Sequence, residues 1–243
     1  MHSSTRLLFC SLSLWAAASG CNQTVEVEQP EQPEKPVDPL VRAQALVQEC
    51  TVCHGMKEAQ RGPILNGMET WYLTDQLEKF RSGLRGGRAS NRSEYLMGVG
   101  VKKIESDFEL AYLADWFAGQ DPVPAIRTVK GDLQKGKAFY EERCASCHGA
   151  EGEGNRLVRG PSLRRLEGWY FLEQMRKFRS GERGYHPLDE GGRAMAAVSK
   201  NISTGTLRDV VAYCVETFGP EEAPSNREKY GLPPSTQPPT EPF

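Results

Sequence analysis

Two short motifs of cysteine and histidine dominate the chemistry that this chain can perform. The sequence reads Cys-Thr-Val-Cys-His at residues 50–54 and Cys-Ala-Ser-Cys-His at residues 144–148. Two thiols on one helical turn can both form thioether bonds to the vinyl groups of a porphyrin, and the adjacent histidine then faces the iron. The motifs therefore predict two covalently bound haem c groups, attached through Cys50, Cys53, Cys144 and Cys147, with His54 and His148 as iron ligands.

A zinc site and a thioredoxin-like dithiol are the alternative uses of a C-x-x-C pair. Zinc ribbons place their two C-x-x-C units roughly 15 to 20 residues apart, whereas the units of this chain begin 94 residues apart. A histidine directly after both pairs also favours haem. The spacing thus argues against zinc.

The sequence around the motifs is duplicated. Residues 71–83 and 169–181 both run from Trp-Tyr to Lys-Phe-Arg-Ser-Gly, at an offset of 98 residues. Because the haem motifs are offset by only 94, the second half carries four extra residues, which we place in the glycine-rich loop at 151–155. The repeat predicts two matched domains.

A six-coordinate haem needs a second axial ligand, and the repeat selects a methionine in each half. Met97 and Met195 coincide at the offset of 98, in what we expect to be a loop before the last helix. Core packing is the other role open to both, and His186 is the competitor of Met195. The remaining methionines of the core are predicted to serve as packing or loop residues: Met56, Met68 and Met175.

The N-terminal end predicts export. Residues 1–20 combine Arg6 with a short apolar run, as in a signal peptide, and the run is too short to span a bilayer comfortably. The ending Ala18-Ser19-Gly20-Cys21 resembles a bacterial lipobox, which predicts a lipid on Cys21; secretion without a lipid is the alternative. The product is expected in the periplasm, held to a bacterial membrane by that lipid.

Hydrophobic periodicity predicts an all-α protein. Each half reads as a helix, a haem motif, a proline-containing loop, an amphipathic helix, a second loop and a final helix, without a convincing strand. We expect domain 1 at 40–118, a linker at 119–131 and domain 2 at 132–218, flanked by a Glu/Pro-rich tether at 21–39 and a Pro-rich tail at 219–243. Domains of about 90 residues have little core, so each haem must supply much of it.

Charge and the remaining unusual residues narrow the partners only slightly. Residues 40–218 hold 26 basic and 23 acidic residues without a basic stripe, so no nucleic-acid partner is expected.

Cys214 matches Phe117 in the repeat and is predicted to be a buried, unpaired thiol. Two pairs of arginines after the middle helices could neutralise haem propionates, meet a partner or form a solvated helix end: Arg81 with Arg179, and Arg85 with Arg183.

The core as a whole resembles the di-haem cytochrome c4 family, in which two class I cytochrome c domains are joined by a short linker. Besides the haem motifs and the paired methionines, the resemblance rests on residues shared by the middle helices: Tyr72, Leu73, Gln76, Leu77, Tyr170 and Gln174. It implies two domains related by a pseudo-twofold axis. It also implies that the carbonyls of Pro63 and Pro161 accept the Nδ1 protons of the haem histidines.

The resemblance implies a carrier of single electrons, because His/Met ligation leaves the iron no open position for a substrate. The expected route runs from a quinol-oxidising complex or dehydrogenase to a terminal oxidase. One alternative is a cytochrome subunit of a larger dehydrogenase or respiratory complex. Another is a di-haem enzyme, such as a peroxidase or a thiosulfate-oxidising enzyme, which would need an unusual ligand from His186 or Cys214.

Overall fold

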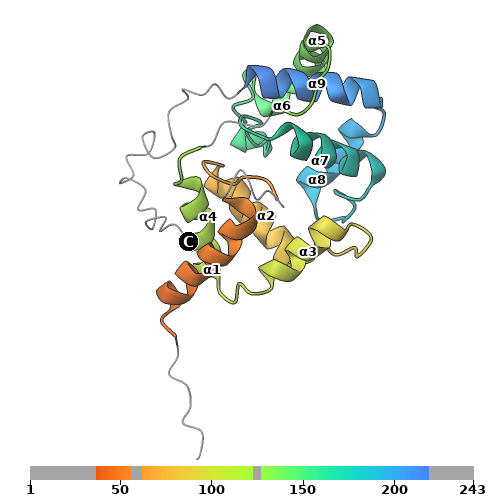
Figure 1. Cartoon of the computed structure of the whole chain (residues 1–243). Coiled ribbons are helices and arrows are strands. Elements are labelled where there is room, and N and C mark those ends of the chain that lie inside the picture. The colour runs from red at the N-terminus through yellow and green to blue at the C-terminus, as the bar shows by residue number, and fades with distance from the viewer. Residues whose placement is uncertain (1–36, 56–61, 123–126, 219–243) are drawn as a thin grey trace, which may run out of the picture. The chain divides into compact units, whose positions relative to one another are not determined.

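The computed structural model describes residues 37–55, 62–122 and 127–218 (Figure 1). The expected signal peptide, Cys21, nearly all of the tether, Met56 and the tail lie outside these ranges. The described residues contain helices and no strand, apart from one isolated bridge between Asn155 and Gly160. The predicted all-α fold is therefore confirmed.

Each half of the repeat forms its own set of helices. The first half contains α1 (Pro39–His54), α2 (Thr70–Arg81), α3 (Arg92–Val101) and α4 (Asp107–Ala118). The second half contains α5 (Leu133–Arg143), the short α6 (Ala145–His148), the 3₁₀ turn η1 (Arg156–Val158), α7 (Gly168–Ser180), α8 (Glu190–Ser199) and α9 (Thr204–Thr217). None of these helices is long and apolar enough to cross a membrane.

Short polar side chains fix where several helices begin. Asp38 accepts a hydrogen bond from the backbone N of Leu40 at 2.8 Å, and Asp132 accepts from Gln134 and Lys135, both at 3.1 Å. At α4, Ser106 and Glu109 form a reciprocal capping box. Such caps pair backbone N–H groups that the first helical turn cannot pair by itself.

The expected loop before the last helix is wrong in both halves, because a helix of ten residues occupies it. These helices are α3 and α8, and they carry Met97 and Met195. Their glycines weaken intrinsic helix propensity, which is why local sequence hid them. Two side chains stabilise them instead: Glu94 of α3 pairs with Arg85, and Asp189, directly before α8, caps that helix at the backbone N of Gly192.

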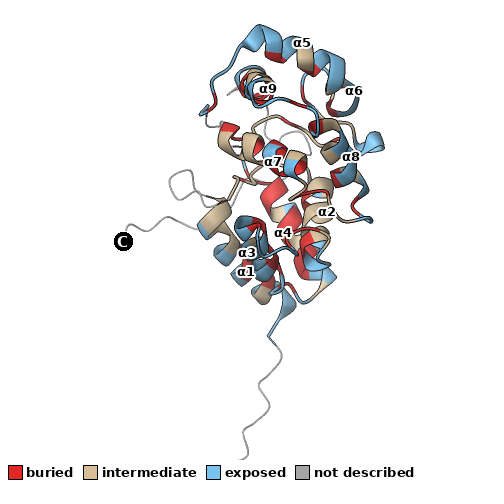
Figure 2. Cartoon of the chain, turned by 90° about the vertical axis from the view of Figure 1, so that its right-hand side faces the viewer, coloured by how far each residue is buried: buried red, intermediate tan, exposed pale blue. Residues whose placement is uncertain are grey.

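The inward faces of the helices form the core. Buried residues lie on one side of α4, as Figure 2 shows, while α7 consists mainly of buried and half-buried residues. One cluster of the first half is Leu46, Val47, Phe80, Val101, Ile104, Leu110 and Leu113, here called the first cluster. The second half holds a larger one, the second cluster, around Tyr140, Phe171, Leu207, Val211 and Cys214.

The first and last helices of the second half cross at a glycine. A Cβ atom on Gly136 of α5 would lie 2.1 Å from the carbonyl oxygen of Asp209 in α9, so no side chain fits there. In the first half the equivalent position is Arg42, which donates to Glu109 at 2.5 Å and to the Lys103 carbonyl oxygen at 2.8 Å. The two halves thus join their terminal helices differently.

Replacing Gly136 with alanine should lower the free energy of unfolding by about 1–3 kcal/mol, because the new methyl group forces α5 away from α9. Denaturant unfolding of the haem-loaded protein, followed by circular dichroism, measures this. Gly205→Ala in α9 is the matched control, since its Cβ would meet only Ser203 Oγ at 3.8 Å. Equal stability of the two variants would contradict the close crossing.

Candidate haem sites

Both histidines of the haem motifs are held by the same hydrogen bond. His54 ends α1 and His148 ends α6, and each Nδ1 lies 2.8 Å from a proline carbonyl oxygen, that of Pro63 or Pro161. A carbonyl oxygen only accepts, so Nδ1 carries the proton and Nε2 is available for a metal. Burial lowers the pKa of both imidazoles more than these bonds raise it, which favours the neutral form that metals bind.

The glycines before these prolines bring the backbone against the haem motifs. A Cβ on Gly62 would lie 2.3 Å from Cε1 of His54, and one on Gly160 would lie 2.0 Å from the carbonyl oxygen of Cys147. Any side chain would displace the motif from its hydrogen-bond acceptor. The repeat aligned these glycines, but only the tertiary structure shows what each one touches.

The four motif cysteines are free thiols in differing surroundings. Cys50 and Cys144 are partly buried beside the first and second clusters, whereas Cys147 is exposed. Burial raises the pKa of Cys50 and of Cys144 to about 11, so both are protonated at neutral pH in the chain without its cofactor. All four thiols are thus free to form thioether bonds.

The paired methionines lie against the same clusters as the haem motifs of their own halves. Met97 and Cys50 both pack on the first cluster, and Met195 and Cys144 both pack on the second. By contrast, Met175 is 5% exposed and belongs to the core itself, as predicted for a packing residue. The structure therefore gathers, in each half, the motif and the methionine that the repeat selected.

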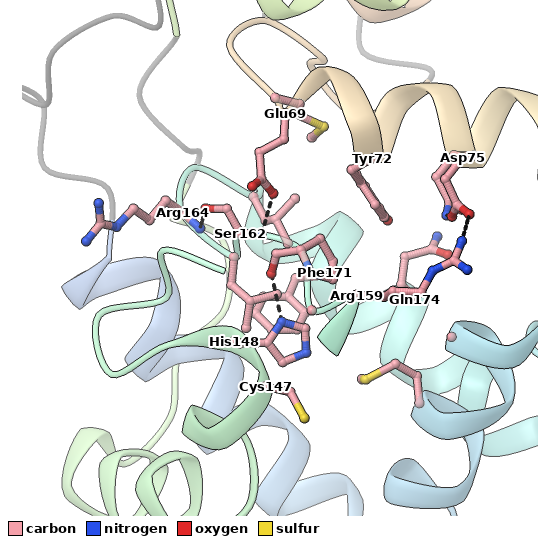
Figure 3. A pocket seen from close by; sticks show the side chains of 18 of the residues that line it. Glu69, Tyr72, Asp75, Cys147, His148, Arg159, Ser162, Arg164, Phe171 and Gln174 are labelled. Carbon is pink, nitrogen blue, oxygen red and sulfur yellow. Dashed lines mark hydrogen bonds and ion pairs between the residues drawn. The ribbon is translucent and has the colours of Figure 1, made fainter. Parts of the chain in front are cut away.

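A cavity of about 1020 Å³ lies beside the second haem motif (Figure 3). This exceeds the roughly 300–1,000 Å³ of common ligand pockets. The predicted site residues of the second half all line it: Cys144, Cys147, His148, Pro161 and Met195. Its apolar wall includes Phe171, Phe178 and Val210. Two thiols, one imidazole, one thioether and an apolar wall are the groups that a haem c requires, so the residues fit that cofactor.

The alternative ligands lie differently. His186 is not among the residues that line this cavity; its Nδ1 accepts from the backbone N of Leu188 at 3.2 Å, and its ring contacts Tyr185. Cys214 does line the cavity, but it is fully buried and burial raises the pKa of its thiol. The buried, unpaired thiol that the sequence predicted is therefore what the described residues show.

Arg85 and Arg183 form a network between the two halves rather than a solvated helix end. They are only 5% and 6% exposed. Arg85 donates to Gln76 of its own half at 2.7 Å and to Gln174 of the other half at 3.1 Å. Arg183 donates to Gln174 at 2.8 Å and to Gln76 at 2.9 Å. Each arginine thus binds both glutamines, and the four residues obey the 98-residue repeat.

A solvated helix end is thus wrong for Arg85 and Arg183. The exposure of a helix end depends on the surface that packs against it, and here that surface belongs to the other half of the chain. Arg81 and Arg179 do stay within their own halves, where they bind Asp107 at 2.7 Å and the Ile202 carbonyl oxygen at 3.0 Å. The repeat paired these arginines correctly. It did not separate the buried pair from the outer one.

Polar contacts extend this interface beyond the arginines. Glu69, the residue before α2, accepts from the backbone N of Ser162 at 2.8 Å, and Asp75 of α2 pairs with Arg159 at 2.7 Å (Figure 3). Lys79, one turn further along α2, pairs with the buried Asp189 at 2.9 Å. These contacts place α2 of the first half against the wall of the cavity in the second half.

Comparisons with known proteins agree with this geometry. The family model described as cytochrome c matches residues 133–217. Cytochrome c4 of Azotobacter vinelandii is 26% identical over 175 residues, which cover 68% of this chain and 82% of that protein. The FixP subunit of a cbb3-type cytochrome c oxidase of Bradyrhizobium sp. (strain ORS 278) is 27% identical over 120 residues, 47% of this chain and 40% of its own.

Solved structures show the same fold. Cytochrome c4 of Acidithiobacillus ferrooxidans superposes with a TM-score of 0.55 at 25% identity, covering 69% of this chain and 98% of that one. Thiosulfate dehydrogenase of Marichromatium purpuratum superposes with a TM-score of 0.58 at 24% identity, covering 73% of this chain and 40% of that one. The likeness to cytochrome c4 thus spans nearly the whole of that relative.

The doubled haem motif, the helical fold built twice and a likeness that covers both halves lead to one conclusion. The chain is a di-haem cytochrome similar to cytochrome c4, which binds two haem c groups covalently and transfers electrons.

Proposed function

We propose that this cytochrome carries single electrons from a quinol-oxidising complex or dehydrogenase to a terminal oxidase, in the periplasm and anchored by a lipid to a bacterial membrane. The observation that carries the proposal is the pairing of each haem motif with a methionine on one apolar cluster, Met97 in the first half and Met195 in the second. A bound haem supplies reversible one-electron chemistry. Two protein ligands on each iron leave no position for a substrate.

The residues that hold each haem follow from the same geometry. We assign Cys50 and Cys53, or Cys144 and Cys147, to the thioether bonds, and His54 with Met97, or His148 with Met195, to the iron. Pro63 and Pro161 orient the imidazoles through their carbonyls. The helix bounds support domains at 40–118 and 132–218, since α4 ends at Ala118 and α5 begins at Leu133.

A role as the fixed cytochrome subunit of a larger complex is the second candidate. The likeness to the FixP subunit favours it, although the match spans only 40% of that protein. A thiosulfate-oxidising enzyme has less support. The likeness to thiosulfate dehydrogenase supports a shared fold, and the cavity lining includes the thioether of Met195 but not the imidazole of His186.

A test of the ligands uses the near-infrared Met-to-iron charge-transfer band of the ferric protein. The band should have the intensity of two haems, and Met97→Leu and Met195→Leu should each remove half, because each deletes one thioether ligand. Met175→Leu is the matched control and should leave the band intact, since Met175 is a core residue. His186→Ala should also leave it intact. An unchanged band in Met195→Leu would refute that ligand.

The carrier role is tested in native membranes supplied with a quinol. Both haems of the full chain should become reduced, and blocking the terminal oxidase should hold them reduced. After detergent extraction a carrier elutes without a stoichiometric partner. A dehydrogenase or oxidase that co-purifies at a fixed ratio would favour the subunit alternative instead.

The membrane anchor rests on Cys21, which lies outside the described residues. Mass spectrometry of the mature protein should find an N-terminal Cys21 that carries a lipid. Cys21→Ala should move the haem-loaded protein from the membrane fraction to the soluble periplasmic fraction. An unmodified Cys21 in the mature chain would show that export occurs without lipidation.

A further inference from the structure

The two interface arginines are repeat partners, yet they differ at one atom. Nε of Arg85 donates to Oε1 of Glu94 at 3.1 Å, and Nη2 donates to the same oxygen at 2.7 Å. Nε of Arg183 is buried and, within the described part of the chain, has no hydrogen-bond acceptor. The acceptors of its other nitrogens are Gln174, Gln76 and Tyr72, all of them neutral. Arg85 is therefore hydrogen-bonded to a carboxylate, whereas Arg183 interacts with that of Glu94 only electrostatically, without a hydrogen bond.

The missing carboxylate has a structural cause. At the 98-residue offset, Glu94 corresponds to Gly192. A Cβ at Gly192 would lie 2.0 Å from Oδ2 of Asp189, whose Oδ1 accepts from the backbone N of Gly192 at 3.0 Å and so caps α8. A glutamate cannot occupy that position without breaking the cap. The second half therefore has no acid at the position that repeats Glu94.

A buried guanidinium without a directly bonded anion is costly, and so is a buried N–H without an acceptor. Arg183 is 6% exposed, and it lines the cavity of the second haem motif. Trp71 of α2 lines the same cavity, and its indole N–H is also buried without an acceptor in the described residues. Two unpaired donors in the wall of one cavity indicate that an anionic oxygen ligand belongs there.

We propose that Arg183 binds a propionate carboxylate of the second haem, while Arg85 serves only as a structural ion pair. This inference rests on the proposed place of the second haem in the cavity. A haem brings carboxylates of its own, so the cofactor supplies the anion that Gly192 cannot. Arg183 also binds Gln76 and Tyr72, and it therefore links that carboxylate to the first half of the molecule.

The test uses the full haem-loaded chain with ¹³C in the propionate carboxylates. Redox-induced infrared difference spectra of Arg183→Gln should show shifted ¹³C-carboxylate bands for one haem. The midpoint potential of that haem should fall, because a nearby cation favours the reduced iron. Adding Met195→His identifies the second haem, since replacing the thioether lowers its potential. The shifted bands should follow that low-potential haem.

The matched control is the double variant R85Q/E94Q, which removes a cation and its anion together. It should leave the ¹³C bands and the potential of the second haem close to those of the wild type. Arg183→Lys keeps the charge but not the guanidinium, so the bands should shift while the potential falls less. This variant also tests the proposal if Arg183→Gln does not fold.

Unchanged ¹³C bands in Arg183→Gln or Arg183→Lys would overturn the proposal. Arg183 would then bind an anion from solution or serve only a structural role. Bands that shift equally in R85Q/E94Q would overturn it as well, because the effect would then belong to the interface as a whole. Failure of the proposed ligation would be visible separately, as a wild-type near-infrared band with less than the intensity of two haems.

Discussion

Two guanidinium groups buried between the halves set the constraint on which the rest of this structure depends. Like charges at one interface repel, and burial adds a desolvation cost to each. Glu94 offsets part of this charge, and Gln76 and Gln174 supply carbonyl oxygens that each accept from both arginines. Each arginine donates to the glutamine of its own half and to the glutamine of the other half. The two halves therefore cannot move relative to one another without breaking these hydrogen bonds.

That constraint fixes the surroundings of the cofactors. The helix α2, which carries Gln76, also provides Asp75 and Lys79 to contacts with the second half, and its side chains line the cavity beside His148. Rigid surroundings suit electron transfer, since the protein has to hold two redox centres at a constant separation rather than admit a substrate. The hydrogen bonds from the histidines to Pro63 and Pro161 extend the same rigidity to the two motif imidazoles.

The duplication did not keep the halves identical. The terminal helices of the second half meet at Gly136, where the first half uses an ion pair of Arg42 with Glu109. Glu94 of α3 and Gly192 of α8 are equivalent positions of the repeat, but only Glu94 brings a charge into the interface. Differences of this kind change the electrostatic surroundings of the two haems, and an electron carrier with two haems can use that difference to order its electron transfer.

The sequence by itself determined the cofactor and its number, because covalent haem attachment needs a local motif, and its repeat predicted one methionine ligand for each haem. It also predicted the helical fold and the buried thiol of Cys214. It missed α3 and α8, because their glycines disfavour a helix. An ion pair of Glu94 with Arg85 stabilises α3, and the cap from Asp189 stabilises α8. The sequence left Arg85 and Arg183 open between a propionate contact, a partner contact and a solvated helix end. Only the tertiary structure decided their burial, since burial depends on which surface packs against a helix, and that surface belongs to the other half of the chain.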